Sequence, residues 1–259
     1  SESQLVTLQS EGELTPVFCI HGVGGNIHTF SQLAEQMGNN RPFYAIQSAG
    51  LLENSEIQSS IQAMVTSYID EIEKVSSEGP VIMAGHSMGG VIAFEIASYL
   101  KQQGREVEQL ILMDSPSPKI IKEELSNKGF EWLDETTRQQ LQGYMELSFD
   151  ENFEQLSFNE KLDYMLEQSQ QAIKEDDNLI NRTIAVHIAN FMAINRFDTD
   201  SLYDGDMLLL KAESNEGHSR YWEYFTSGKL ITVDVNGDHH TMLDAPHVGY
   251  VADVISNKV

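Results

Sequence analysis

The segment Val81–Val91, which reads VIMAGHSMGGV, constrains the fold more than any other part of the chain. Its apolar start is typical of a buried strand, and the apolar spacing over Val91–Gln103 predicts a helix directly after it. A Gly-x-Ser-x-Gly sequence at such a junction predicts a sharp turn that holds the Ser87 hydroxyl clear of the backbone at the edge of a sheet. Gly85 and Gly89 fit that turn because a side chain at either position would clash across it. Ser87 is therefore a candidate nucleophile, with a purely structural glycine turn as the alternative.

Strand and helix patterns alternate along the rest of the chain. Apolar runs bounded by Gly, Pro or Asn are typical of buried parallel strands, and alternation with helices predicts an α/β fold with a mostly parallel, doubly wound sheet. In such sheets ligands bind at the carboxyl ends of the strands. The expected strands are Val17–Ile20, Phe43–Ile46, Val81–Ala84, Leu110–Met113, Met207–Leu210 and Leu230–Val235. The expected helices are Phe30–Met37, Ile57–Val75, Val91–Gln103, Tyr221–Phe225 and Pro246–Ile255.

The region from residue 115 to residue 200 breaks this alternation, because it contains helical patterns and no convincing strand. Connections between neighbouring strands and helices are usually about two to six residues long, so this region is an insertion. One interpretation is a helical subdomain whose apolar residues pack on one another. A compatible interpretation, which we favour, is a helical lid over the strand ends. We therefore expect one domain, residues 1–259, with a helical lid insertion at 115–200.

Composition excludes several classes of protein. The 259 residues include 16 basic and 40 acidic side chains, a net charge of −24, which disfavours binding to nucleic acid or to an anionic membrane surface. A single cysteine excludes a disulfide framework and a cysteine-rich metal site, and we expect no metal. The start, Ser1–Gln4, lacks the features of a signal peptide, so a cytoplasmic location is expected. Because Ser1 is not an initiator Met, the chain is consistent with a piece of a longer polypeptide or with an added residue.

A second glycine cluster, Ile20–Asn26, follows the first strong strand. It is not a dinucleotide-binding fingerprint, because the third glycine of that fingerprint would fall at Ile27. A His-Gly turn at this point of a hydrolase sheet supplies a backbone donor to an oxyanion hole. We expect the N–H groups of Val23 and Met88 to form that hole. The alternative is a glycine loop that only passes close to the Ser87 turn.

A serine nucleophile needs a base, and the loop after the last expected strand offers two histidines. His239 and His240 are adjacent, so only one of them can face Ser87. This loop fits the chain order of the fold, in which the histidine comes last. Of the two histidines we favour His239, in part because of the resemblance described below. His21 and His86 lie inside the two glycine turns and are expected to shape those loops. The other histidines, among them His28 and His218, lack a motif.

An acid must orient the base and stabilise its charged form. Two acids follow expected strands: Asp114 comes after the strand next to that of the nucleophile, and Glu213 comes after a later strand. Many hydrolases of this fold take the acid from the later strand, which favours Glu213. Asp114 ends the neighbouring strand just before the insertion. Position alone leaves the choice between Asp114 and Glu213 open.

Taken together, these residues resemble the thioesterase domains that end non-ribosomal peptide and polyketide synthases, which have the α/β-hydrolase fold. The resemblance implies that Asp114 is the catalytic acid and that His239 is the base. His240 stands where the family usually has an aromatic residue. Matching segments run almost from end to end: VFCIHGVGG at 17–25, GHSMGG at 85–90, LMD at 112–114, Trp222, and VNGDHHTML at 235–243.

The resemblance also implies a reaction and a partner. Ser87, activated by His239 and Asp114, would attack an acyl thioester on the phosphopantetheine arm of a carrier domain. Water or an internal nucleophile would then release an acid or a ring, with no metal or bound coenzyme. Carrier domains of such synthases are usually acidic, so a partner of this acidic chain is expected to be covalently tethered upstream. The alternatives are a stand-alone serine esterase or lipase, a proofreading thioesterase acting in trans, and a non-catalytic binding module of the same fold.

Overall fold

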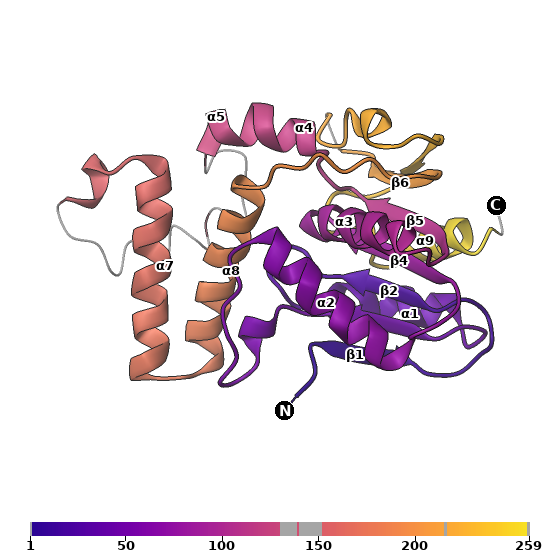
Figure 1. The fold of residues 1–259 in the computed structure, drawn as a ribbon, viewed down its shortest axis with the longest axis horizontal. Coiled ribbons are helices and arrows are strands. Elements are labelled where there is room, and N and C mark those ends of the chain that lie inside the picture. Colours follow the sequence, from indigo (N-terminus) through magenta and orange to yellow (C-terminus); the bar gives the residue numbers. More distant parts are fainter. Residues whose placement is uncertain (1, 130–138, 140–151, 215–216, 258–259) are drawn as a thin grey trace.

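The computed structural model describes residues 2–129, 139, 152–214 and 217–257. A seven-stranded sheet in the order β1-β3-β2-β4-β5-β6-β7 forms the centre of the molecule (Figure 1). Strand β1 is antiparallel to β3, and the remaining neighbours are parallel, which confirms the predicted mostly parallel α/β sheet. The strands are β1 Leu5–Gln9, β2 Val17–Ile20, β3 Phe43–Ile46, β4 Val81–His86, β5 Val107–Met113, β6 Met207–Ala212 and β7 Leu230–Val235.

Helices cover both faces of this sheet (Figure 1). Because side chains alternate along a strand, each central strand contributes apolar side chains to the cores on both faces of the sheet. On β2, Phe18 and Ile20 pack toward α2 and α3, whereas Val17 and Cys19 pack toward α1 and α9. Strands buried on both faces read as continuous apolar runs, which is why most of them are visible in the sequence. The helices of the two faces are α1 Ser31–Met37, α2 Ile61–Val75, α3 Met88–Gln102 and α9 Val248–Ile255.

Three sequence predictions need correction. Strand β1 is missing from the predicted set, because this edge strand is only partly buried and has no continuous apolar run. The helix predicted from Ile57 begins at Ile61, because the Ser60 hydroxyl accepts a hydrogen bond from the Ala63 N–H at 3.2 Å and so caps the helix there. The predicted helix Tyr221–Phe225 is a short 3-10 turn, η6 Trp222–Phe225. Among the described residues, no helix is long and apolar enough to cross a bilayer.

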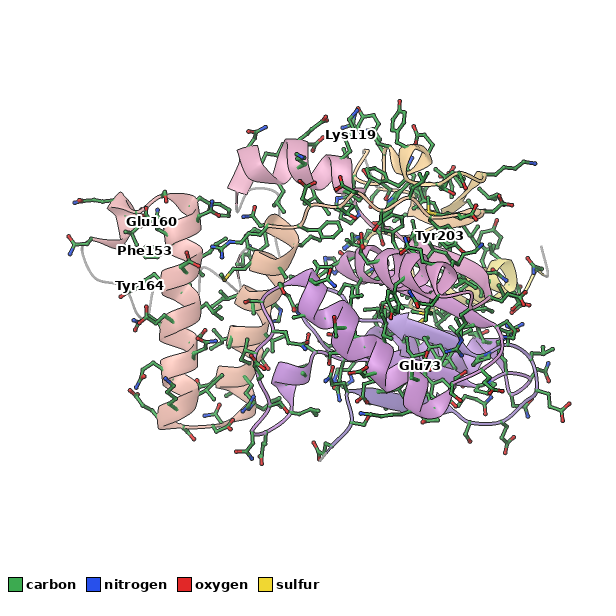
Figure 2. All side chains as sticks on the ribbon, in the orientation of Figure 1. Glu73, Lys119, Phe153, Glu160, Tyr164 and Tyr203 are labelled. Carbon is green, nitrogen blue, oxygen red and sulfur yellow. The ribbon has the colours of Figure 1, made fainter. Side chains whose placement is uncertain are left out.

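Helical elements occupy the described parts of the segment between β5 and β6; residues 130–138 and 140–151 lie outside the described part. The two longest, α7 and α8, lie side by side at one end of the molecule (Figure 1). A capping box between Ser157 and Glu160 begins α7. The ring of Phe153 packs against Tyr164 near the start of α7, with centroids 5.7 Å apart (Figure 2). The elements are α4 Pro118–Ile120, the π-helical turn η3 Ile121–Leu125, α5 Ser126–Lys128, η5 Phe153–Gln155, α7 Phe158–Glu175 and α8 Leu179–Asn195.

Candidate active site

Ser87 lies on a strained turn between β4 and α3. Its φ is +56°, in the left-handed region that residues other than glycine seldom adopt. The turn is tight enough that a Cβ on Gly85 would lie 2.0 Å from the Gly89 carbonyl carbon, and a Cβ on Gly89 would lie 2.1 Å from the Ile20 carbonyl oxygen. A side chain at Gly85 would thus clash across the turn, as predicted, whereas one at Gly89 would instead clash with the end of β2. The turn leaves Ser87 partly exposed between the buried residues His86 and Met88.

One expected oxyanion donor, Met88, follows Ser87 directly in the chain, and the other, Val23, lies in a loop close to the Ser87 turn. Met88 is the first residue of α3, so its N–H has no acceptor within the helix and lies at the positive end of the helix dipole. Val23 lies in the loop after β2, which passes close to the turn: a Cβ on Gly22 would lie 3.9 Å from the Ser87 Cβ. The structure thus brings both expected donor residues to the same end of the sheet as Ser87.

The expected base and the expected acid are in direct contact. His239 Nδ1 lies 2.6 Å from Asp114 Oδ2, and the Asp114 carboxylate is almost fully buried. Asp114 has a φ of +51°, and its Oδ1 accepts a hydrogen bond from the Ala212 N–H at the end of β6, at 3.0 Å. Glu213, the alternative acid, is exposed. Of the two acids that the sequence leaves open, Asp114 is the one in contact with His239.

A turn built by Asp238 presents His239. Asp238 Oδ1 accepts hydrogen bonds from the N–H groups of His240 and Thr241, at 2.9 and 2.8 Å. These bonds, the one from Thr241 foremost, hold the pKa of the Asp238 carboxyl below its ordinary value. His240 is exposed, whereas the half-buried His239 contacts the acid. Between the two adjacent histidines, the geometry therefore favours His239.

His86 contacts the backbone of His239, and no sequence pattern indicates this contact. Its Nε2 lies 2.7 Å from the His239 carbonyl oxygen, and the two rings lie 4.7 Å apart. A carbonyl can only accept, so Nε2 carries the proton. Burial, followed by the effect of His239, lowers the pKa of His86 to about 3, so the ring stays neutral beside the base. His218, which has no motif, also packs edge-on against His239, with ring centroids 5.6 Å apart.

Burial of two histidines predicts an acid-sensitive fold. Mainly because burial disfavours the charged ring, the pKa of His21 is lowered from 6.5 to about 4, and that of His86 to about 3. Below pH 6.5 the unfolded chain binds protons that the folded chain does not. The free energy of unfolding should therefore decrease as pH falls from 6.5 toward 4.5, by roughly 1.4 kcal/mol per pH unit for each histidine. Urea unfolding at several pH values measures this slope.

Two glutamine variants provide the comparison for this pH effect. His86→Gln retains a donor for the His239 carbonyl and should remove one histidine's share of the slope. His28 is exposed, so His28→Gln should leave the slope as in the parent. An unchanged slope in His86→Gln would contradict the prediction.

The fold and this cluster define the class of protein. A mostly parallel sheet, a serine on a strained strand-to-helix turn and a histidine–aspartate pair drawn from later loops are the features of an α/β-hydrolase. Within the described part of the chain, no three His, Cys, Asp or Glu side chains come together as a possible metal site. The family model for the thioesterase domain matches residues 15–259. The chain therefore belongs to the thioesterase domain family.

Curated relatives of the chain include proteins much longer than the chain itself. It is 28% identical over 260 residues to malpinin synthetase of Mortierella alpina, covering 98% of this chain and 3% of that protein. It is 35% identical over 120 residues to the polyketide synthase PksR of Bacillus subtilis, covering 46% of this chain and 5% of that protein. The chain thus spans only a small part of these curated relatives.

Solved structures agree with the fold. A four-domain nonribosomal peptide synthetase aligns over 99% of this chain and 20% of its own length, with a TM-score of 0.74 and 26% identity. The isolated Vlm2 thioesterase domain aligns over 98% of this chain and 97% of its own length, with a TM-score of 0.70 and 22% identity. The chain is therefore a thioesterase domain that resembles those of non-ribosomal peptide and polyketide synthases.

Proposed function

We propose that this domain releases an acyl or peptidyl chain from the phosphopantetheine arm of a carrier domain through an acyl-Ser87 intermediate. The observation that carries the proposal is the 2.6 Å contact between His239 and Asp114 beside the strained Ser87 turn. Because Nδ1 of His239 is bound to the carboxylate, Nε2 is left to accept the serine proton. The relatives support the substrate class, since they include a synthetase and a polyketide synthase.

In the first half of the reaction, His239 Nε2 takes the Ser87 proton while the serine oxygen attacks the thioester carbonyl. Asp114 stabilises the imidazolium that forms, and it holds the ring in the orientation that the transfer needs. The N–H groups of Val23 and Met88 bind the developing oxyanion. The carbon–sulfur bond then breaks, the imidazolium protonates the departing thiolate, and an ester to Ser87 remains.

In the second half, a nucleophile attacks the acyl-serine ester. His239 removes a proton from water, or from a hydroxyl or amine of the acyl chain itself, and returns it to the serine oxygen as the ester bond breaks. Water yields a free acid, and an internal nucleophile yields a ring. Residues of the chain supply every proton transfer in this sequence, so the proposed mechanism requires no metal or bound coenzyme.

We further propose that the carrier is covalently tethered upstream of the domain and that the helical segment 115–200 acts as a lid over the strand ends. The net charge of −24 opposes association with another acidic body, and a linker overcomes this by raising the local concentration to roughly the millimolar range. The position of α7 and α8, between β5 and β6 in the chain and beside the sheet in space, supports the lid (Figure 1).

The substrate form tests this proposal. The acyl chain of a loaded carrier domain should be released with a kcat/KM at least about tenfold above that for a soluble oxygen ester of the same acyl group, a difference of ~1.4 kcal/mol in transition-state binding. Mass spectrometry of the carrier and chromatography of the ester measure the two rates. Faster turnover of the oxygen ester would instead support a stand-alone esterase. Tight binding of a detached carrier at low salt would contradict the tethering argument.

A further inference from the structure

The loop that carries Val23 has little conformational preference of its own. Val23 follows Gly22 and precedes Gly24 and Gly25, and glycine leaves the backbone free over a wide range of φ and ψ. A donor that stabilises developing charge must be aimed before the reaction, because reorienting it during the reaction costs part of the stabilisation. The orientation of the Val23 N–H must therefore be fixed by groups that contact the loop.

The peptide plane before Val23 is held at its Gly22 end by His21. The Gly22 carbonyl lies 2.6 Å from His21 Nδ1 and accepts the Gly25 N–H at 3.0 Å. The carbonyl can only accept, so Nδ1 carries the proton of this neutral, buried ring, and Nε2 accepts from the Tyr68 hydroxyl at 2.6 Å. The Gly22 carbonyl and the Val23 N–H belong to one planar peptide, so the bonds at the carbonyl restrain the N–H. They hold only one end of that peptide, which can still rotate about the direction of the carbonyl until the Val23 end is held as well.

The peptide plane after Val23 is fixed by the insertion. Nδ2 of Asn190, in α8, donates a hydrogen bond to the Val23 carbonyl at 2.9 Å and another to the Ser48 hydroxyl oxygen at 3.1 Å. Asn190 is only 1% exposed, so water cannot readily replace either bond. With the planes on both sides held, the two backbone dihedrals of Val23 are determined.

The same face of α8 lies directly on the loop backbone. Val186 and His187 share that face with Asn190, since they precede it by four and three residues. A Cβ on Gly25 would lie 2.5 Å from Val186 Cγ1, and a Cβ on Gly24 would lie 3.4 Å from His187 Nε2. At Gly25 there is therefore no room for a side chain between the loop and α8.

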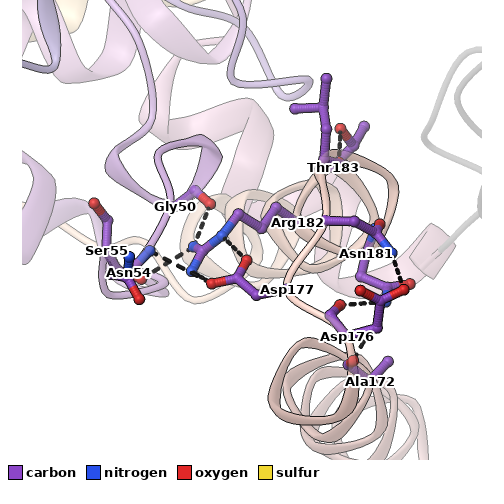
Figure 3. Close-up of polar contacts among 11 residues, drawn as sticks. Gly50, Asn54, Ser55, Ala172, Asp176, Asp177, Asn181, Arg182 and Thr183 are labelled. Atoms are coloured by element: carbon purple, nitrogen blue, oxygen red, sulfur yellow. Dashed lines mark hydrogen bonds and ion pairs between the residues drawn. The ribbon is translucent and has the colours of Figure 1, made fainter. Parts of the chain in front are cut away.

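Arg182, one turn before Val186, holds α8 against the loop that carries Val23. Its Nη1 donates to the Gly50 and Ser55 carbonyls at 2.9 and 3.1 Å, and its Nη2 donates to Asp177 Oδ2 at 2.8 Å (Figure 3). The Arg182 guanidinium is buried although Asp177 is exposed, so loss of its partners would leave a buried charge without hydrogen bonds, which is costly. Helix α8 is therefore part of the fixed surroundings of the site, and any movement of the insertion would have to leave it in place.

We propose that Asn190 is a positioning residue of the active site, which binds the Val23 carbonyl so that α8 fixes the Val23 N–H for the oxyanion. This inference rests on the oxyanion role proposed above for Val23. The inference assigns a function in the reaction to a helix of the insertion. This helix would act through the backbone of Val23.

Asn190→Ala in the complete chain tests the inference. With a soluble acyl thioester of N-acetylcysteamine, kcat should fall about 10²-fold, the loss typical of one oxyanion donor, while KM stays within about threefold. Hexylboronic acid adds to a serine hydroxyl and forms a tetrahedral anion, so its inhibition constant should rise by a similar factor. Asn190→Leu, which fills the space without a donor, should give the same pattern if the alanine variant folds poorly.

Asn181→Ala is the matched control on the same helix. Asn181 Nδ2 donates to the Asp176 and Ala172 carbonyls, at 2.8 and 3.3 Å, and these bonds join α8 to α7 rather than to the loop. This variant should lower the melting temperature while kcat and boronic acid affinity remain near those of the parent. Folded Asn190 variants with kcat and boronic acid affinity within about threefold of the parent would overturn the inference, as would an equal loss in Asn181→Ala.

The same measurements separate the inference from the function on which it rests. If the parent neither hydrolyses the thioester nor binds the boronic acid through Ser87, as judged against Ser87→Ala, the proposed function fails, and the inference fails with it. If the parent does both and the Asn190 variants behave like the parent, only the inference fails.

Discussion

Replacing Ser87 by alanine is expected to abolish labelling of the chain by a fluorophosphonate and to lower kcat for thioester release by about 10⁵–10⁶-fold. Ser87 lies on the strained turn next to His86, which contacts the His239 carbonyl, and in the proposed mechanism alanine would leave the His239–Asp114 pair with no nucleophile to activate. Direct attack by water is the remaining route, helped only by the oxyanion donors and by substrate binding. Intact-mass spectrometry measures the labelling, and a thiol-release assay measures kcat.

Ser31→Ala is the control, because Ser31 is an exposed serine on α1. Both variants should melt near the parent temperature, and only Ser87→Ala should lose the label. A labelled Ser87→Ala chain would place the nucleophile elsewhere and remove the proposed mechanism.

Each of the three residues proposed to be catalytic belongs to a local pattern that is visible in the sequence. Ser87 stands inside a glycine turn, Asp114 directly follows a buried strand, and His239 follows Gly-Asp in the last loop. Strands β2 to β6 were predictable for a related reason, since strands that are largely buried on both faces read as apolar runs. The edge strand β7 was predicted from its apolar residues although only Val235 in it is buried. The choice between Asp114 and Glu213 was not predictable from position, because both follow parallel strands, and only the packed structure shows which carboxylate meets the base.

The residues that support the site could not be predicted in the same way. His86 contacts the His239 carbonyl across 153 positions of sequence, and Asn190 contacts the Val23 carbonyl across 167. In both cases the partner is a backbone carbonyl. Because every residue has such a carbonyl, no characteristic residue type at the partner position reveals the contact in the sequence. Asn190 also lies in a helical insertion without a recognisable motif. Long-range contacts to the backbone therefore require the folded structure.

Replacing Asp114 by asparagine is expected to lower kcat by about 10³–10⁴-fold. The Ala212 N–H donates to Oδ1 of residue 114, so the oxygen of the new amide should remain there and its NH₂ group should face His239 Nδ1. Nδ1 would then have to accept, which moves the ring proton to Nε2. A ring protonated at Nε2 cannot take the Ser87 proton, so the base would be lost although the side chains keep nearly the same positions.

Glu213→Gln makes the same chemical change in the alternative acid. Because Glu213 is exposed, this variant should keep kcat within about twofold of the parent. Single-turnover acylation with a thioester measures the affected step directly, and the melting temperature shows that both variants are folded. If Asp114→Asn loses less than about tenfold while Glu213→Gln loses more, the later strand supplies the acid, and the contact between Asp114 and His239 serves to hold the loop.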